Sequence, residues 1–256
     1  MLIPVFNEAS TVEEVLTRVL SVPIDLEIIV VDDGSTDGSY AILQKAEKLA
    51  GRSLRVFSHK RNRGKGAAIR TAIPHARGKY TIIQDADLEL NPMDYVPIIG
   101  KLRTEGIDVV FGSRFLEGRP DMPLLSLLAN RLLVWLVRVL YGVKITDEAT
   151  CYKAFETPFL KGLKLNCQHF DFDPEVTALI ILNNLTIAEV PIRYLPRTRS
   201  EGKKITWVDG MIAAWTLVKI RLSVIRSPCQ KHDFGKALDS VTDPEGNYSE
   251  RASADF

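Results

Sequence analysis

Along residues 1–115, short runs of apolar residues alternate with segments whose apolar residues recur every three or four positions. A short apolar run is typical of a buried strand, and the wider spacing is typical of a helix that buries one face. Their alternation predicts parallel βα units, and hence an α/β fold with a mostly parallel sheet flanked by helices. The expected strands are Leu2–Phe6, Glu27–Val31, Leu54–Phe57, Tyr80–Gln84 and Val109–Phe111.

Several expected helices begin at capping signals. Ser10 and Glu13 have the spacing of a capping box and precede apolar positions at helical spacing. Asn91 and Pro92 form an N-cap and first-turn pair. A further helix is expected from about Ala67.

Polar clusters follow three of the expected strands. They are Asn7-Glu8, Asp32-Asp33 and Asp85-Ala86-Asp87. Ligands of open α/β sheets bind outside the carboxyl ends of the strands, so these clusters are expected to converge on one site. Asp85 and Asp87 share a face of the extended chain, and paired carboxylates suit Mg²⁺ or Mn²⁺ with a substrate diphosphate. An Asp-x-Asp alone is more often a polar turn, and the convergence favours a site.

A basic loop, Lys60–Gly66, precedes the helix expected at Ala67. Its glycines expose backbone N–H groups near a helix N-terminus, where phosphates often bind, and Lys65 adds positive charge. The loop lacks the spacing of a P-loop, so a solvated basic turn is an equal alternative.

The composition favours a globular chain with no general attraction to nucleic acid. Its 256 residues are 46% hydrophobic, which allows one large domain or a domain with an appendage. The formal net charge is +1, so no overall field favours nucleic acid. Cys151, Cys167 and Cys229 lack the spacing of a zinc site or a disulfide framework, which favours a reducing compartment. With Pro4 so near the start, we expect no signal peptide.

Two apolar segments bear on membrane binding. Leu124–Val143 approaches the ~20 residues that span a bilayer. Central arginines cost about 2.5–3.5 kcal/mol each there, so Arg131 and Arg138 favour a helix lying in the interface over a spanning helix. A buried core helix is the alternative. Apolar residues from Met211 to Ile225 form a second stripe, which suits a bundle face or a membrane face equally. Residues 227–256 are polar and predict a disordered tail.

The ordered motifs of the chain resemble those of family 2 glycosyltransferases, and most closely dolichol-phosphate mannose synthases and bacterial polyprenyl-phosphate glycosyltransferases. The first motifs are Pro4–Glu8, Asp32–Ser35, Asn62–Gly66, Asp85–Leu88 and Gly112–Arg114. The resemblance continues through Asn130-Arg131, Thr146-Asp147, Cys151–Lys153, Phe172–Glu175, Glu189–Ile192 and Gly202–Lys204. It covers residues 1–226, which are expected to form one transferase domain with candidate membrane or acceptor-side helices at 114–143 and 205–226. Cys151 stands where the family usually has Gly, and Glu89 where the mannose synthases often have Gln.

The resemblance implies a GT-A fold and inverting transfer of a hexose, mannose first and glucose next, from a nucleotide-diphosphate sugar such as GDP-mannose or UDP-glucose. The donor would contact Pro4, Phe6, Asn7, Glu8, Asp33, Lys65, Asp85, Ala86 and Asp87. Mg²⁺ or Mn²⁺ would be held by Asp87 and Glu89 and would neutralise the leaving diphosphate. The implied catalytic residues are Asp85, Asp87, Arg114 and Arg131.

The implied acceptor is a polyprenyl phosphate, dolichyl or undecaprenyl, on the cytoplasmic face of a membrane. An acceptor phosphate is already anionic, so it needs cationic partners and placement more than a general base. Arg114, Arg131, Arg199 and Lys204 are the expected partners. Two alternatives stay open. One is a family 2 transferase that acts on a hydroxyl acceptor, and the other is a non-catalytic sugar-nucleotide-binding protein.

Overall fold

A computed structural model describes residues 1–104, 106–197, 202, 204 and 206–226. The strands are β1 (Leu2–Val5), β2 (Ile28–Asp32), β3 (Leu54–Ser58), β4 (Tyr80–Ile82), β5 (Val109–Ser113), β6 (Lys153–Glu156) and β7 (Ile187–Pro191). The helices are α1 (Val12–Leu20), α2 (Ser39–Ala50), α3 (Lys65–Ala72), α4 (Tyr95–Leu102), α5 (Leu124–Tyr141), α6 (Thr157–Gly162), α7 (Phe172–Leu182) and α8 (Trp207–Arg226). Short 3-10 helices cover Gly51–Ser53, Ile73–His75 and Pro92–Asp94.

The strands form a three-stranded sheet, β1-β2-β3, and a four-stranded sheet, β4-β6-β5-β7. A parallel bridge between Leu2 and Ile83 brings β1 beside the end of β4 and so joins the two sheets. Pairing is parallel in β1-β2-β3 and between β5 and β7, whereas β6 runs antiparallel to both its neighbours. The predicted mostly parallel α/β fold is confirmed, and the antiparallel β6 lies outside the expected strands.

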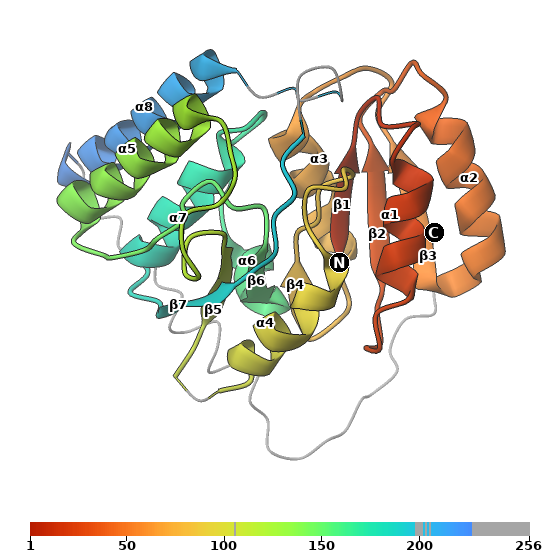
Figure 1. Cartoon of the computed structure of the whole chain (residues 1–256), viewed down its shortest axis with the longest axis horizontal. Coiled ribbons are helices and arrows are strands. Elements are labelled where there is room, and N and C mark those ends of the chain that lie inside the picture. Colours follow the sequence, from red (N-terminus) through yellow and green to blue (C-terminus); the bar gives the residue numbers. More distant parts are fainter. Residues whose placement is uncertain (105, 198–201, 203, 205, 227–256) are drawn as a thin grey trace, which may run out of the picture.

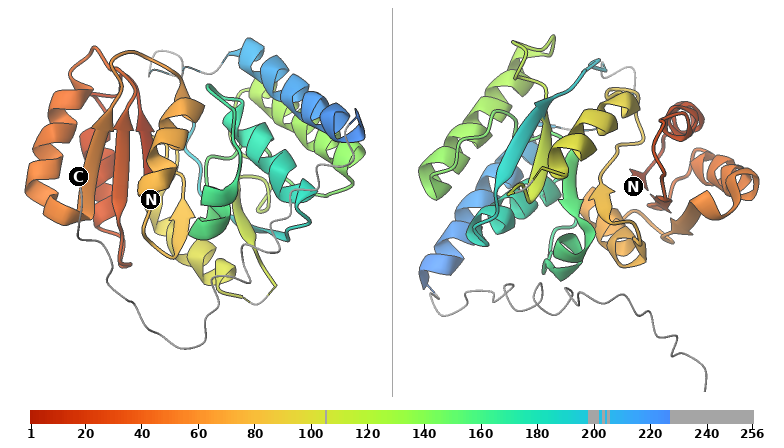
Figure 2. Two further views of the ribbon diagram at one scale, coloured as in Figure 1. Left: turned by 180° about the vertical axis from the view of Figure 1, so that it is seen from behind. Right: turned by 90° about the horizontal axis from the view of Figure 1, so that it is seen from below.

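Helices surround the joined sheets, as Figures 1 and 2 show. All residues of β2 and β5 are buried, which explains why these strands have apolar sequences without alternation. Helices α1 and α2 lie beside β1-β2-β3, whereas α5, α7 and α8 pack together beside the other sheet. The Tyr141 hydroxyl of α5 donates to the Leu217 carbonyl of α8 at 2.7 Å. Helices α5 and α8 are thus fixed to one another.

Two predictions of helix starts had different outcomes. The N-cap role of Asn91 is confirmed, because its side chain accepts the Met93 N–H at 2.9 Å. The capping box of Ser10 and Glu13 is wrong: α1 has Thr11 at its N-cap and no side-chain cap hydrogen bond. The Thr11 hydroxyl instead contacts the Glu8 carboxylate and the Ala86 carbonyl, and so ties the helix to the polar strand ends.

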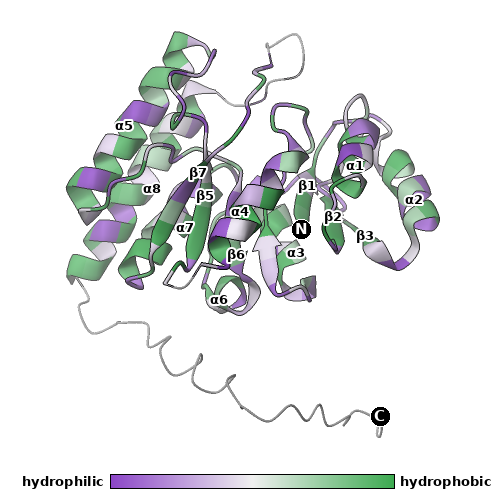
Figure 3. Cartoon of the chain, turned by 60° about the horizontal axis from the view of Figure 1, so that its bottom comes forward, coloured by the Kyte–Doolittle hydropathy of each residue, from purple (hydrophilic) through white to green (hydrophobic). Residues whose placement is uncertain are grey.

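Helices α5 and α8 are amphipathic. Leu133 and Val137 of α5 are buried. The opposite face carries an exposed apolar stripe of Leu125, Leu128, Leu132, Trp135 and Val139, and α8 exposes Trp207, Met211, Trp215 and Ile225. The ribbon in Figure 3, coloured by hydropathy, shows apolar residues along α5 and α8. In the described part of the chain, α5 is the one helix with the length and apolar composition to cross a bilayer, criteria that a core helix can also meet.

Candidate active site

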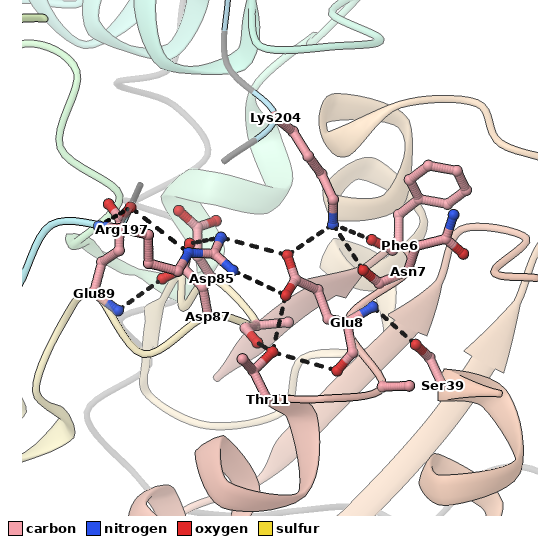
Figure 4. A network of polar contacts seen from close by, with 12 residues as sticks. Phe6, Asn7, Glu8, Thr11, Ser39, Asp85, Asp87, Glu89, Arg197 and Lys204 are labelled. Carbon is pink, nitrogen blue, oxygen red and sulfur yellow. Dashed lines mark hydrogen bonds and ion pairs between the residues drawn. The ribbon is translucent and has the colours of Figure 1, made fainter. Parts of the chain in front are cut away.

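The polar clusters after β1, β2 and β4 meet at one edge of the joined sheets, as expected from parallel strands. Tight turns position them. Asn7 has a positive φ of 49°, and its side chain accepts the Thr36 N–H at 2.8 Å. The Glu8 N–H donates to the Ser39 hydroxyl at 2.9 Å, which directs the Glu8 carboxylate toward the Asp87 side of the edge (Figure 4).

Asp33 is almost fully buried and holds the basic loop. Its carboxylate accepts the N–H groups of Arg63 and Gly64, and His59 Nδ1 lies 2.6 Å away. Gly64 has a φ of +97°, and a Cβ at this position would lie 2.3 Å from the Gln168 carbonyl oxygen. Only glycine therefore allows this approach.

The loop is not a backbone cradle for phosphate. Besides the Arg63 and Gly64 N–H groups held by Asp33, the Gly66 N–H donates to the His169 carbonyl and the Ala67 N–H to the Gln168 carbonyl. The prediction that this loop offers its N–H groups to phosphate is therefore wrong, because the protein itself takes them up. The Lys65 side chain points to the site, where Asn62 and Gly64 of the same loop also line the cavity described below.

Lys65 neutralises Asp85. Lys65 Nζ lies 2.8 Å from Asp85 Oδ1 and 3.9 Å from Asp173 Oδ2. Burial by itself raises the pKa of Asp85, but the Lys65 ammonium outweighs it and holds the pKa below its ordinary value. Asp173 also pairs with the fully buried Lys153 at 2.8 Å. The buried acidic and basic side chains at the floor of the site, Lys65, Asp85, Lys153 and Asp173, therefore neutralise one another.

A second cluster of carboxylates, from Glu8, Asp87 and Glu89, surrounds Arg197. Arg197 was not among the residues expected at the site from the sequence. Its guanidinium lies 2.7 Å from Asp87 Oδ2, 3.1 Å from Glu8 Oε2 and 3.7 Å from Glu89 Oε1 (Figure 4). Burial, and then the charge of Asp85, raise the pKa of Asp87 to about 7, which Arg197 opposes. Arg197 follows β7 in a segment without periodicity, so nothing in its local sequence except its charge indicates these contacts.

Asp87 and Glu89, with Glu8, supply the hard oxygen ligands that Mg²⁺ and Mn²⁺ prefer. Their donor chemistry fits such an ion. Within the described residues, however, no three potential ligands converge at metal-binding distance, and the Arg197 guanidinium lies among the three carboxylates. Arg197 therefore occupies the space between these carboxylates.

The predicted acceptor residues separate into different environments. Arg114 is held in a bidentate pair with the buried Asp147, with both N–O distances at 2.7 Å. Lys204 contacts Glu8 Oε1 at 2.7 Å and the backbone carbonyls of Phe6 and Asn7. Arg199 lies outside the described residues.

Arg131 is exposed and does not line the cavity described below, so the structure does not bring it together with Arg114. Asn130, Leu133 and Val137 are buried on one face of α5. Successive residues of a helix differ by about 100° in direction, so Arg131 lies off this buried face. Asn130 instead faces inward, where its side-chain oxygen accepts the N–H groups of Glu148 and Ala149.

One cavity of about 940 Å³ joins these groups to α5 and α8. Its polar end is lined by Glu8, Asp33, Lys65, Asp85, Asp87 and Arg197, with Arg114 and Glu148 further along. Its apolar end is lined by Met122, Leu125, Leu128, Leu132, Trp207 and Met211. Leu125, Leu132, Trp207 and Met211 also belong to the exposed apolar faces, so the cavity leads from a charged centre to an apolar surface.

Comparison with known proteins gives a family match and several relatives. Residues 1–127 match the profile of glycosyl transferase family 2. The chain is 28% identical over 207 residues to dodecaprenyl-phosphate galacturonate synthase of Rhizobium johnstonii, covering 79% of this chain and 60% of the relative. It is 30% identical over 210 residues to undecaprenyl-phosphate 4-deoxy-4-formamido-L-arabinose transferase of Edwardsiella ictaluri, covering 79% and 62%. The chain thus spans less than two thirds of these relatives.

Solved structures with a similar fold include mannosyl-3-phosphoglycerate synthase from Rubrobacter xylanophilus, with a TM-score of 0.66, 16% identity, and coverage of 89% of this chain and 73% of that one. Another is the mannosyltransferase PcManGT from Pyrobaculum calidifontis in complex with GDP-Man and Mn²⁺, with a TM-score of 0.54, 18% identity, and coverage of 93% and 77%. These similarities establish the GT-A fold.

Proposed function

The chain belongs to glycosyl transferase family 2, and from this premise we propose that it transfers a hexose from a nucleotide-diphosphate sugar to a polyprenyl phosphate, with inversion. The observation that carries the proposal is the single cavity, which has carboxylates and cations at one end and the apolar side chains of α5 and α8 at the other. A phosphate on a long hydrocarbon chain has this same combination of chemistry. The names of both relatives, a dodecaprenyl-phosphate galacturonate synthase and an undecaprenyl-phosphate transferase, include a polyprenyl phosphate, which supports this class of acceptor.

In the proposed reaction, an acceptor phosphate oxygen bonds to the anomeric carbon while the bond from that carbon to the diphosphate breaks. The acceptor is already an anion, so no side chain has to remove a proton. The carboxylates also suit this scheme, because Asp147 is paired with Arg114 and Asp173 with Lys153, which leaves neither placed as a general base.

We assign the donor end to Pro4, Phe6, Asn7, Glu8, Asp33, Lys65, Asp85, Ala86 and Asp87. All of these line the cavity except Asn7, which is held at its edge through Thr36 and Lys204. Asp87 and Glu89 would hold Mg²⁺ or Mn²⁺, which when bound would neutralise the leaving diphosphate. We assign the acceptor phosphate to Arg114, Arg131, Arg199 and Lys204, of which Arg114 and Lys204 line the cavity.

The sugar is proposed to be mannose, with glucose next, so the donors are GDP-mannose and UDP-glucose. The mannosyltransferase of similar fold was solved with GDP-Man and Mn²⁺, which makes GDP-mannose the first donor to test. The formamido-arabinose and galacturonate named for the relatives make their donors the next to test.

We further propose that residues 1–226 form the transferase domain, and that α5 and α8 rest on the cytoplasmic face of a membrane. Their exposed leucines and tryptophans would enter the interface while the buried series of α5 remains in the core. The proposed tail, 227–256, lies outside the described residues.

The decisive experiment is incubation with a panel of labelled nucleotide sugars, dolichyl or undecaprenyl phosphate, and Mg²⁺ or Mn²⁺, followed by analysis of the lipid phase. The expected product is a polyprenyl-phosphate sugar of inverted anomeric configuration. Label that reaches only hydroxyl-bearing acceptors would favour the hydroxyl-acceptor alternative. Donor binding without transfer to any acceptor would favour a non-catalytic binding protein.

A further inference from the structure

Arg197 is held among the carboxylates by both its backbone and its side chain. The backbone N–H of Leu195 donates to the Glu89 carbonyl at 2.8 Å, and that of Arg197 donates to Glu89 Oε1 at 3.1 Å. A bridge between Leu90 and Tyr194 fixes the preceding residues. The Arg197 side chain is only 13% exposed, so its position is built into the site.

The oxygens that Arg197 contacts are those that a divalent ion would need. A guanidinium binds carboxylates through N–H groups, with nitrogen–oxygen distances near 2.7–2.9 Å. Mg²⁺ requires oxygens at about 2.0–2.1 Å in a near-octahedral arrangement. Asp87 Oδ2 and Glu8 Oε2 cannot satisfy both at once, because drawing them onto a small ion removes the space that the guanidinium fills.

Lys204 supports the carboxylates from a different side. Its ammonium contacts Glu8 Oε1, whereas Arg197 Nη1 contacts Glu8 Oε2. Loss of Arg197 would leave Asp87 and Glu89 without a salt-bridge partner among the described residues, with Arg114 as a more distant cation that still acts on Glu89. An incoming divalent ion would offset that loss.

We propose that Arg197 is an internal counter-cation that occupies the carboxylate group of Glu8, Asp87 and Glu89 when no metal is bound, and that a divalent ion binds by displacing it. This inference rests on the metal assignment made within the proposed function. It makes Arg197 a device that keeps metal affinity low in the free protein. When only a fraction of molecules is competent to bind, the apparent dissociation constant equals the intrinsic one divided by that fraction. If the guanidinium is displaced in a tenth of the molecules, metal binding is therefore weakened about tenfold.

Calorimetric titration of the full chain with Mn²⁺, without nucleotide or acceptor, tests the inference. Arg197→Gln removes the charge and keeps much of the side-chain length, so Mn²⁺ should bind about tenfold more tightly than to the wild type. Arg193→Gln is the matched control. Arg193 lies four residues before Arg197, pairs with Asp94 outside the carboxylate cluster and is 63% exposed, so its replacement should leave Mn²⁺ affinity unchanged. Equal or weaker Mn²⁺ binding by Arg197→Gln, or no binding by either protein, would overturn the inference.

Thermal melting checks that the Arg197→Gln variant is folded. Its melting temperature should be lower than that of the wild type without metal, because the carboxylates repel one another, and Mn²⁺ should raise it more than it raises that of the wild type. If the variant does not fold, NMR of the wild type labelled at arginine provides the test. Mg²⁺ should shift the side-chain signal assigned to Arg197, and an unshifted signal at saturating Mg²⁺ would refute displacement.

The outcome is independent of sugar transfer. A chain that makes polyprenyl-phosphate sugar but shows no Arg197 effect would retain the proposed function and lose this inference. A chain with the Arg197 effect and no lipid product would retain the counter-cation and lose the proposed acceptor.

Discussion

Lys65 Nζ lies 2.8 Å from Asp85 Oδ1, and the side chains of the two residues are 12% and 29% exposed. The pair joins the start of α3 to the turn after β4. It also fixes the charge of the site, because the ammonium keeps the pKa of Asp85 low although burial favours the neutral acid. Asp85 is therefore a carboxylate at neutral pH, and Lys65 helps to hold the donor end of the cavity together.

Replacing Lys65 with Met should destabilise the fold as well as weaken donor binding. Removing one partner of a buried pair usually costs about 3–5 kcal/mol, and the partial exposure of Asp85 lowers our expectation to about 2–3 kcal/mol. Urea unfolding measures the loss, with Lys45→Met on the exposed face of α2 as control. If Lys65→Met unfolds at the same urea concentration as Lys45→Met, the pair contributes no stability and our account of the floor is wrong.

Asp87→Ala should abolish transfer while the protein stays folded. Asp87 is proposed to hold the ion that neutralises the leaving diphosphate, and such stabilisation is worth several kcal/mol of the barrier. Sugar transfer is measured beside thermal melting, with the exposed Asp25→Ala as control. Wild-type activity in Asp87→Ala, or in the wild type with excess chelator, would remove Asp87 from the metal assignment.

The sequence predicted the strand ends well because they depend on local pattern. Apolar runs fix the strands, and parallel strands bring Glu8, Asp33 and Asp85 to one edge whatever the loops do. Contacts between distant segments were not predictable. Arg197 reaches Glu8 over 189 positions, and nothing in either local sequence signals the pair.

The basic loop and α5 show a second limit. Glycines at positions 64 and 66 suggested N–H groups free for phosphate, but whether such groups are free depends on residues as far away as Gln168 and His169. Similarly, the position of Arg131 within an apolar stretch suggested that it binds the acceptor phosphate beside Arg114. The direction of a side chain on a helix is settled by which neighbours are buried, and here they point Asn130 inward instead.

Arg131→Ala should weaken use of polyprenyl phosphate while leaving nucleotide-sugar affinity and stability unchanged. The side chain is exposed on α5, where substitutions usually alter stability by less than about 0.5 kcal/mol. The KM for polyprenyl phosphate is measured by transfer and nucleotide-sugar affinity by calorimetry. Arg138→Ala, also exposed on the same helix, controls for general loss of positive charge. Equal effects of the two variants would mean that Arg131 has no specific role in binding the acceptor phosphate.

Glu148 should make the fold less stable as the pH rises. Its side chain is fully buried near Asp147, Asp173 and Lys153, and burial is the main cause that raises its pKa from 4.5 to about 7. Below pH 4.5 both the folded and the unfolded forms hold the proton. Between pH 4.5 and 7 the unfolded chain loses the proton first, so folding is progressively disfavoured.

Glu148→Gln removes this titration. The difference in free energy of unfolding, variant minus wild type, should therefore increase by roughly 3 kcal/mol between pH 4.5 and pH 7.5. Urea unfolding across this pH range measures the gain, and any constant cost of the new amide cancels in the comparison. A difference between the two proteins that does not change with pH would show that Glu148 titrates normally.

Replacing Leu128, Leu132 and Trp135 together with Ser should release the protein from membranes without unfolding it. These side chains are 51%, 52% and 56% exposed on one stripe of α5, so they contribute little to the core and are available to lipid. Vesicle co-sedimentation should show binding by the wild type, stronger with anionic lipid by roughly 1 kcal/mol per basic residue near the surface, and loss of binding by the triple variant.

Leu133→Ser is the matched control on the buried face, and it should lower the melting temperature, because a polar group in the core costs several kcal/mol. If the triple variant melts as early as Leu133→Ser, the stripe is part of a packed interface. A wild-type protein that ignores vesicles with or without anionic lipid would contradict the membrane proposal and move the acceptor toward a soluble molecule.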